Sequence, residues 1–317
     1  MNPIRAARLH EHSRPLEIES VELPDPGDGE VRVELEFAGV NPVDRYTAEG
    51  RMAPDGPLPR TLGGEASGQV DGRPVMVAGG GLGSARDGVW AQAAVVPQDA
   101  VVDLPDGVAT RDAAAMGIAG LTAWKTVCEL GRVDAEDRVL VLGASGGVGS
   151  MIVSLAHATG ATVWGQTGSS DKADGITDQG ADRAIVAGPD ELGDALADLE
   201  PTVVFDPLGD GFVASALEAL SVRGRLVSFG TSASPEVQLN MQTVYRKMLS
   251  VLGYGGLQLD QNERRAGLEK ALEALRAGDL RVVVDEVLAL DQVNDAFRRI
   301  AERQVRGKLL LGLSEER

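Results

Sequence analysis

A glycine-rich segment in the middle of the chain constrains its fold more than any other feature. The sequence Gly143-Ala144-Ser145-Gly146-Gly147-Val148-Gly149 directly follows an apolar run at 139–142 and opens a helical pattern. An apolar strand, a glycine turn and a helix in this order predict a dinucleotide-binding fingerprint. A tight turn that binds no ligand is the alternative interpretation of the same glycines.

The residues of this turn have separate expected roles. Ala144 takes the place of the first glycine of the fingerprint, Gly146 lets the backbone approach a pyrophosphate, and Gly149 lets the helix pack closely on the strand. Helix N-termini offer unpaired N–H groups and a partial positive charge, which suit an anion. We therefore expect the pyrophosphate of a dinucleotide to contact Ala144, Ser145, Gly146, Gly147, Val148 and Gly149.

The sequence around this turn alternates between strands and helices. Apolar runs at 161–164, 184–186, 202–205, 225–229 and 249–252 predict strands, and the segments 148–159 and 172–179 predict helices that end at Gly160 and Gly180. Apolar strands that alternate with helices are typical of a parallel sheet covered on both faces. The expected fold class is therefore α/β, with a doubly wound, Rossmann-type sheet.

A length of 317 residues favours two domains over one. The first ~110 residues are rich in Val, Gly and Pro and contain alternating runs such as 31–37, which predict a β-rich domain. Ala113 opens a helical stretch that runs toward Glu129. The expected domains are 1–113, the first part of a catalytic domain; 114–254, the dinucleotide-binding domain; and 255–317, which returns to complete the first.

The end of the second strand bears on cofactor choice. An enzyme that uses NAD carries an Asp or Glu there for the ribose hydroxyls, but residues 164–167 include no acid. Gly168, Ser169, Ser170 and Lys172 follow, and two hydroxyls with an ammonium could bind the 2′-phosphate of NADPH. A solvated lysine beside a serine N-cap is the alternative.

Charge and cysteine content exclude several classes of function. With a net charge of −18, nucleic acids and anionic membranes are poor partners. The acidic excess and the scarcity of lysine are typical of proteins from salt-loving organisms, although an ordinary acidic enzyme is also compatible. Cys128 is the only cysteine, which excludes an internal disulfide and a thiolate zinc cluster. Neither a signal-peptide pattern nor a membrane-spanning apolar run is present, so we expect a cytoplasmic protein.

Several further motifs carry a resemblance to a known family. They include Gly39-Val40-Asn41-Pro42-Val43-Asp44, Gly63-Gly64-Glu65, Gly117-Ile118-Ala119-Gly120-Leu121-Thr122, Ser228-Phe229-Gly230 and Arg306-Gly307-Lys308. With the glycine turn, they resemble the medium-chain dehydrogenase/reductase superfamily in its zinc-independent, zeta-crystallin-like quinone oxidoreductase branch. The resemblance implies a Rossmann domain inserted in a GroES-like β-barrel catalytic domain, with cofactor and substrate in a cleft between the domains, and a homodimer.

The resemblance also bears on metal binding. The zinc branch has Cys at Gly39 or Val40-Asn41 and His at Gly64, so the ligands of a catalytic zinc are missing here. The three histidines, His10, His12 and His157, lie outside these motifs, and no metal site is expected. Glu65 persists from the zinc pattern without its partners, and a structural role is expected for it.

The resemblance implies that three residues lie near the nicotinamide and form the catalytic set: Asn41, Tyr46 and Thr122. It also implies that Lys172 binds the 2′-phosphate. Three further residues are expected in the cofactor site: Phe229, Gly230 and Lys308. An Asn-Pro turn is the alternative for Asn41, and packing inside the barrel is the alternative for Tyr46. The chain departs from the family by carrying Met52 and Ala187 where tyrosines are frequent. These departures weaken the cases for a defined proton donor and for a preference for NADPH.

The expected activity is hydride transfer from NADPH to a small-molecule acceptor, either a quinone or an α,β-unsaturated carbonyl compound. An enoyl-thioester or enone reductase and a non-catalytic NADPH-binding protein are the alternatives.

Overall fold

The computed structural model describes residues 3–314, which divide into two compact units. Unit 1 contains the described residues up to Leu121, the segment Leu259–Arg276 and the described residues from Val284 onward. Unit 2 contains Thr122–Gln258 and Ala277–Val283. The chain therefore passes from unit 1 to unit 2 after Leu121, eight residues beyond the predicted boundary at 113, and the predicted return segment 255–317 is shared between the units.

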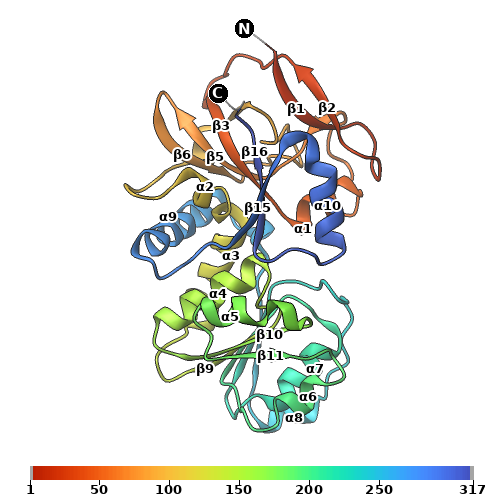
Figure 1. Ribbon diagram of the computed structural model, residues 1–317, viewed down its shortest axis with the longest axis vertical. Helices are drawn as coiled ribbons and strands as arrows, with labels where there is room; N and C mark the ends of the chain where they lie inside the picture. Colours follow the sequence, from red (N-terminus) through yellow and green to blue (C-terminus); the bar gives the residue numbers. More distant parts are fainter. Residues whose placement is uncertain (1–2, 315–317) are drawn as a thin grey trace. The chain divides into compact units, whose positions relative to one another are not determined.

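Unit 1 is built mainly from antiparallel strands (Figure 1). One sheet has the order β15-β16-β3-β5-β6-β8, with β7 paired to the first half of the long β3, and a smaller sheet has the order β2-β1-β4. The strands are β1 (Ile4–Leu9), β2 (Glu17–Val21), β3 (Glu30–Val40), β4 (Arg60–Thr61), β5 (Glu65–Val70), β6 (Arg73–Ala78), β7 (Ala93–Pro97), β8 (Val101–Asp103), β15 (Val284–Ala289) and β16 (Lys308–Gly312). The helices are α1 (Pro42–Ala48), α2 (Thr110–Ala113), α9 (Gln261–Ala277) and α10 (Val293–Ala301).

The core of unit 1 follows from the alternation in its strands. In β3, Val33 and Leu35 are buried while Glu34 between them is exposed, which is the period of two of a half-buried strand. The C-terminal strand β16 buries Leu309 and Leu311 in the same cluster and pairs antiparallel with β3. The C-terminal strand therefore completes the sheet that the N-terminal strands form.

Unit 2 contains a parallel sheet of six strands among the described residues, in the order β11-β10-β9-β12-β13-β14. Its strands are β9 (Arg138–Val141), β10 (Thr162–Thr167), β11 (Arg183–Val186), β12 (Val203–Asp206), β13 (Arg225–Ser228) and β14 (Ser250–Gly253). The order reverses between β9 and β12, which places a topological switch point at the carboxyl end of β9. The doubly wound, Rossmann-type sheet predicted from the sequence is confirmed.

Helices connect the strands of unit 2 and lie on both faces of the sheet (Figure 1). They are α4 (Gly147–Ala158), α5 (Ala173–Asp178), α6 (Leu192–Ala195), α7 (Asp210–Ala219) and α8 (Met241–Arg246). The helix expected to run from Ala113 toward Glu129 is instead divided into α2, a π-helical segment at Met116–Gly120, the short α3 (Leu121–Trp124) and a second π-helical segment at Lys125–Gly131. The sequence shows only helical periodicity here, and π-helical turns leave little trace in it.

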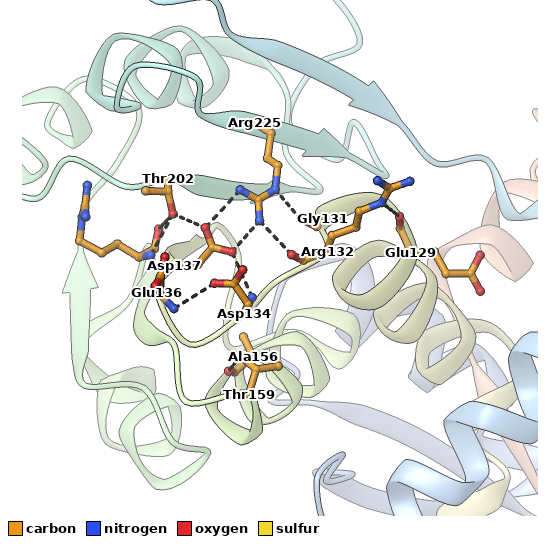
Figure 2. Close-up of polar contacts among 11 residues, drawn as sticks. Glu129, Gly131, Arg132, Asp134, Glu136, Asp137, Ala156, Thr159, Thr202 and Arg225 are labelled. Atoms are coloured by element: carbon orange, nitrogen blue, oxygen red, sulfur yellow. Dashed lines mark hydrogen bonds and ion pairs between the residues drawn. The ribbon is translucent and has the colours of Figure 1, made fainter.

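An ion pair closes the amino-terminal edge of the sheet in unit 2 (Figure 2). The carboxylate of Asp137 accepts hydrogen bonds from the Nη2 of Arg225 at 2.6 Å and from the hydroxyl of Thr202 at 2.6 Å. Arg225 also donates to the carbonyl groups of Gly131 and Arg132, where the second π-helical segment ends. One guanidinium thus satisfies two carbonyl groups at a helix C-terminus and ties it to β9, β12 and β13.

No helix within residues 3–314 combines the length and the apolar character needed to cross a bilayer.

Candidate functional site

The glycine turn connects β9 to α4 at the switch point of unit 2. The N–H of Ser150 donates to the carbonyl of Gly146 at 2.9 Å, and Gly146 is the N-cap of α4. A Cβ on Gly149 would lie 2.3 Å from the carbonyl oxygen of Gly143, so a side chain there would force α4 away from β9. A Cβ on Gly146 would meet no protein atom closer than 3.4 Å, so this glycine keeps the space beside the turn clear. The N-terminus of α4, a helix of 12 residues that begins in this turn, offers N–H groups and a partial positive charge that suit a pyrophosphate.

The turn is held from the side by β10. The buried Gln166 accepts the N–H of Gly143 at 3.0 Å through Oε1, and its backbone carbonyl accepts the N–H of Ala144 at 2.8 Å. The hydroxyl of Ser145 lies 3.3 Å from the hydroxyl of Thr167 at the end of the same strand. These contacts hold the start of the turn, from Gly143 to Ser145, against β10.

The segment after β10 contains the residues predicted to select NADPH. Ser170 and Lys172 lie in a 3₁₀ turn that leads into α5, and the hydroxyl of Ser169 donates to the carboxylate of Asp171. A Cβ on Gly168 would meet no atom within 4 Å, so this segment borders open space. Hydroxyls and an ammonium suit a ribose 2′-phosphate, while the carboxylate of Asp171 opposes one.

Asp206 is a buried acid at the same edge of the sheet that the motifs do not predict. Its Oδ1 accepts the N–H groups of Leu208 at 2.9 Å and of Gly209 at 3.1 Å. Burial raises the pKa of this carboxyl, and the hydrogen bonds from Leu208, Gly209 and Ser228 oppose that rise. An acid directly after an apolar strand beside the switch point was the signal in the sequence that could have indicated it.

The turn after Asp206 brings together two predicted cofactor segments. A Cβ on Gly143 would lie 3.2 Å from the Cγ of Pro207, and a Cβ on Gly230 would lie 3.0 Å from the carbonyl oxygen of Pro207. The N–H of Phe229 donates to the carbonyl of Asp206 at 2.9 Å. Pro207 therefore packs between the glycine turn and Phe229-Gly230, and all three segments line the carboxyl edge of one sheet.

Unit 1 contains the second group of candidates, around the start of α1. Asn41 is the N-cap of this helix, and the Oδ2 of Asp44 accepts its backbone N–H at 2.8 Å. The side-chain amide of Asn41 donates to the Oε1 of Glu65 at 2.7 Å, and its Oδ1 accepts a hydrogen bond from the ammonium of Lys308 at 2.5 Å. The Asn-Pro turn predicted as an alternative is present, and the amide is engaged by buried charged groups.

Glu65 and Lys308 form an ion pair at the centre of this group. The Nζ of Lys308 lies 2.8 Å from the Oε1 of Glu65, and Lys308 is only 4% exposed. The Oε2 of Glu65 accepts the backbone N–H of Ile118 at 2.7 Å. One carboxylate thus joins β5, β16, the start of α1 and the first π-helical segment, which is the structural role expected for Glu65.

Lys308 was expected in the cofactor site. Its ammonium has three donors, and three acceptors surround it, since it also lies 3.4 Å from the carbonyl oxygen of Val40. Its role toward a cofactor stays a prediction, and its contacts within unit 1 are structural.

Asp44 is buried against this ion pair. Desolvation raises the pKa of its carboxyl to about 7, helped by the negative charge of Glu65 and opposed by the hydrogen bonds of Asn41 and the charge of Lys308. The protonated form of this carboxyl therefore persists to a higher pH than in a solvated aspartate. This property was not predicted, because nothing in the sequence distinguishes Asp44 from the other acidic residues.

Tyr46 lies two residues further along α1. Its ring is half-buried and contacts two guanidinium groups, with the Cζ of Arg51 at 4.4 Å and the Cζ of Arg45 at 5.3 Å from the ring centroid. Cations over an aromatic face hold the ring in place. Tyr46 is thus fixed near Asn41 and Asp44 on one short helix.

Thr122 begins unit 2 and lies in α3 between the two π-helical segments. It is buried, and its carbonyl accepts the hydroxyl of Thr126 at 2.7 Å. The structure thus places Asn41, Tyr46 and Lys308 in unit 1, and it places Thr122 with all the other predicted cofactor residues in unit 2.

Asn41 and Gly64 occupy two positions at which the zinc branch carries metal ligands, and neither residue provides a Cys, His or carboxylate ligand. Within residues 3–314, three such side chains come together at His10, Glu17 and Glu19 on the β1–β2 ladder, where two of them are exposed. This group lies at the smaller sheet of unit 1.

Comparisons with known proteins agree with this arrangement. Residues 27–106 match the alcohol dehydrogenase GroES-like domain family, and residues 147–285 match the zinc-binding dehydrogenase family. The chain is 28% identical to quinone oxidoreductase-like protein 2 of Mus musculus, over 98% of this chain and 92% of that protein. It is 27% identical to a quinone oxidoreductase of Pseudomonas aeruginosa, over 93% of this chain and 95% of that protein.

A solved structure of mycobacterial Rv1454c complexed with NADPH has the same fold, with a TM-score of 0.85 and 23% identity over 98% of this chain and 99% of that one. Together with the glycine turn and the sheet order, these matches confirm the resemblance to the medium-chain dehydrogenase/reductase superfamily and to its quinone oxidoreductase-like proteins. The chain belongs to the medium-chain dehydrogenase/reductase superfamily of oxidoreductases, in its quinone oxidoreductase-like branch.

Proposed function

We propose that the protein is an NADPH-dependent reductase that transfers hydride to a quinone or to an α,β-unsaturated carbonyl compound. The observation that carries the proposal is the carboxyl edge of the sheet in unit 2. There the glycine turn offers the N-terminus of α4 to a pyrophosphate, and the next strand ends in Ser169, Ser170 and Lys172 where an enzyme specific for NAD carries an acid.

The residues of the chain would bind and orient, because the nicotinamide supplies the hydride. The turn from Ala144 to Gly149 would hold the pyrophosphate, and Phe229-Gly230 would border it across Pro207. In unit 1, Tyr46 is a candidate hydrogen-bond donor to the oxygen of the acceptor. Asn41 would contribute indirectly, by holding Glu65 and Lys308 in position, because its side-chain amide is already hydrogen-bonded to both of them.

We also propose that catalysis needs no zinc, although the family matched by residues 147–285 is named for zinc binding. A catalytic zinc site uses three protein ligands, and an asparagine and a glycine stand at two of the expected positions. Metal analysis of protein purified without added zinc should find far less than one ion per chain. Stoichiometric zinc that resists a chelator would overturn this proposal.

The activity is tested by following NADPH oxidation with a panel of quinones, enones and enoyl thioesters, in low and in high salt. We expect turnover with at least one quinone or enone and slower turnover with NADH. Turnover with enoyl thioesters alone would instead assign the protein as an enoyl-thioester reductase. Tight NADPH binding without turnover of any acceptor would identify a non-catalytic NADPH-binding protein.

We further propose that the protein is a homodimer joined through the outer edge of β14. This strand ends the sheet of unit 2, and Tyr245, Met248 and Val251 around it are 63%, 51% and 49% exposed. Residues 221–258 carry four basic residues (Arg223, Arg225, Arg246 and Lys247) and one acidic residue (Glu236), in a chain of net charge −18. The segment that contains β14 is thus less acidic than the chain as a whole and exposes apolar side chains, which favours a protein partner.

A further inference from the structure

A histidine and two glutamates come together on the β1–β2 hairpin of unit 1. His10 directly follows β1, Glu17 begins β2, and Glu19 lies two residues further along the same strand. One ligand atom from each of the three side chains lies within 4.8 Å of the other two. We call these three residues the hairpin cluster.

The geometry of the strand directs both glutamates of the hairpin cluster to one face of β2. Successive side chains of a strand point to opposite faces, and Ile18, between the two glutamates, packs against the main core of unit 1. Glu17 and Glu19 therefore lie on the face turned away from that core. The Oε1 of Glu19 contacts the Nε2 of His10. The backbone of a single hairpin thus brings the three side chains together.

No arginine of the hairpin balances the charge of these two carboxylates. Arg8 lies opposite Glu17 in the ladder, but its guanidinium binds Asp87 at 2.6 Å and the hydroxyl of Thr61 on β4 at 3.1 Å. The other two arginines of residues 4–21 also pair elsewhere: Arg5 with Asp291 and Arg14 with Glu11.

The carboxylate of Glu17 has neither a hydrogen bond nor an ion pair with any residue from 3 to 314. Glu17 and Glu19 carry like charges and offer oxygen atoms within 4.8 Å of each other, so they repel. A cation bound between them would remove this repulsion.

The donor atoms of the hairpin cluster suit zinc. Zinc in proteins is bound by imidazole nitrogen and carboxylate oxygen atoms, and a site with three protein ligands leaves one position to water. The imidazole discriminates against magnesium and calcium, which prefer oxygen ligands. Zinc–ligand bonds of about 2.0–2.2 Å require the ligand atoms to approach somewhat more closely than 4.8 Å. Because His10 and Glu17 are exposed, rotation of their side chains can bring them to this distance.

We propose that the hairpin cluster binds a zinc ion, with water completing the coordination of the metal. The ligand positions of the zinc branch carry Asn41 and Gly64 in this chain, so the hairpin cluster uses other residues. A neutral imidazole and two carboxylates have a charge of −2, which the ion neutralises. The ion would link β1 to β2 and stabilise the hairpin. Because two of the ligands are exposed, a chelator should remove it.

Calorimetric titration of zinc chloride into chelator-treated protein without a histidine tag tests the proposal. We expect the wild-type protein to bind one zinc ion per chain. His10→Gln and Glu17→Gln should each raise the Kd at least about 10-fold, because loss of a mere outer partner of a metal ligand already costs about 10- to 100-fold. The matched controls are His157→Gln, at an exposed histidine of α4, and Glu22→Gln, at an exposed acid just after β2. Both controls should bind zinc as the wild type does.

Two further measurements examine the ligands and the effect of the ion. X-ray absorption of the zinc-loaded protein should show one imidazole among otherwise oxygen ligands. Added zinc should raise the unfolding temperature of the wild-type protein and leave that of His10→Gln unchanged.

Three results would overturn the proposal: no binding of zinc by the wild-type protein, an unchanged Kd in His10→Gln, or equal losses in Glu17→Gln and Glu22→Gln. The last two would mean that the acidic surface attracts the ion without a defined ligand set. None of these measurements uses turnover, so their outcome is independent of the proposed reductase activity.

Discussion

The ammonium nitrogen of Lys308 lies 2.8 Å from the Oε1 of Glu65, and the two residues are separated by 243 positions in the sequence. Glu65 is completely buried at the start of β5, and Lys308 begins the last strand, β16. Two charges taken out of water are costly unless they pair and their remaining hydrogen-bonding groups are satisfied. Here Asn41, Ile118 and Val40 supply those partners.

We therefore predict that Glu65→Gln destabilises the protein by roughly 3–5 kcal/mol, because Lys308 would keep its buried charge without a counter-charge. Urea denaturation measures this free energy of unfolding. Glu273→Gln is the control, since Glu273 makes an exposed pair with Arg276, and a change within about 0.5 kcal/mol is expected there. A loss for Glu65→Gln as small as that of the control would mean that the ion pair does not stabilise unit 1.

Asp44 gives the second prediction, which concerns stability and pH. Because the folded state raises the pKa of this carboxyl to about 7, the folded protein binds its proton more tightly than the unfolded chain does. The resulting stabilisation is complete below the unfolded pKa, near 4, and is lost as the pH rises through about 7. The free energy of unfolding of the wild-type protein, minus that of Asp44→Asn, should fall across this window, by at most about 4 kcal/mol. A difference that does not change with pH would show that Asp44 titrates normally.

The sequence predicts the sheet of unit 2 and its glycine turn well, because both depend on local patterns. Apolar runs of four or five residues between helices define parallel strands, and the spacing of Gly146 and Gly149 matches the close approach of α4 to β9. The strand order could not be predicted in this way, because alternating strands and helices with right-handed connections are compatible with more than one doubly wound order.

The group around Glu65 could not be predicted in the same way. Its members lie on β5, β16, α1 and the first π-helical segment, and only the folded chain brings them together. Glu65 was expected to be structural without a named partner, and Lys308 was expected to contact the cofactor. The raised pKa of Asp44 depends on burial and on the charge of Glu65, neither of which a motif contains.

Arg225 gives a third prediction. Its guanidinium binds Asp137 and two carbonyl groups at the end of a helix. Arg225→Met would therefore remove the counter-charge of Asp137, which keeps the hydrogen bond from Thr202, and would remove the donor of both carbonyl groups. We expect a loss of roughly 3 kcal/mol in the free energy of unfolding. Arg276→Met, at an exposed pair, should change it by less than about 0.5 kcal/mol. Burial alone would raise the pKa of the Asp137 carboxyl, but the hydrogen bonds from Arg225 and Thr202 lower this pKa overall. The ionised carboxylate should therefore stabilise the folded state above about pH 4, and this stabilisation should be lost as the pH falls below that value.

Lys172 gives a fourth prediction, on cofactor choice. An ammonium bound to a 2′-phosphate contributes roughly 1.5–3 kcal/mol, or about 10- to 150-fold in affinity. Lys172→Ala should therefore raise the Kd for NADPH by this factor and leave the Kd for NADH nearly unchanged, as measured by fluorescence titration. Asp171→Asn is the companion variant, because removing that carboxylate should strengthen NADPH binding. Equal losses for both cofactors in Lys172→Ala would assign Lys172 a role in folding.

The last prediction concerns the outer edge of β14. The N–H groups of Ser250 and Tyr254 donate to carbonyl groups on the side of β13. In a parallel ladder, alternate residues direct their backbone groups to opposite sides of the strand. The backbone N–H and C=O of Val251 therefore face the open edge, where a second copy could extend the sheet. Val251→Glu places a charge among the exposed side chains of Tyr245 and Met248 and should convert a dimer into a monomer of 33.1 kDa. Val186→Glu is the matched control, because Val186 is equally exposed, at 49%, on β11 at the opposite edge of the same sheet. Sedimentation velocity in high salt, where the repulsion between acidic surfaces is screened, measures the mass of each variant. A wild-type monomer, or a dimer that persists in Val251→Glu and dissociates in Val186→Glu, would show that β14 is not the contact between copies.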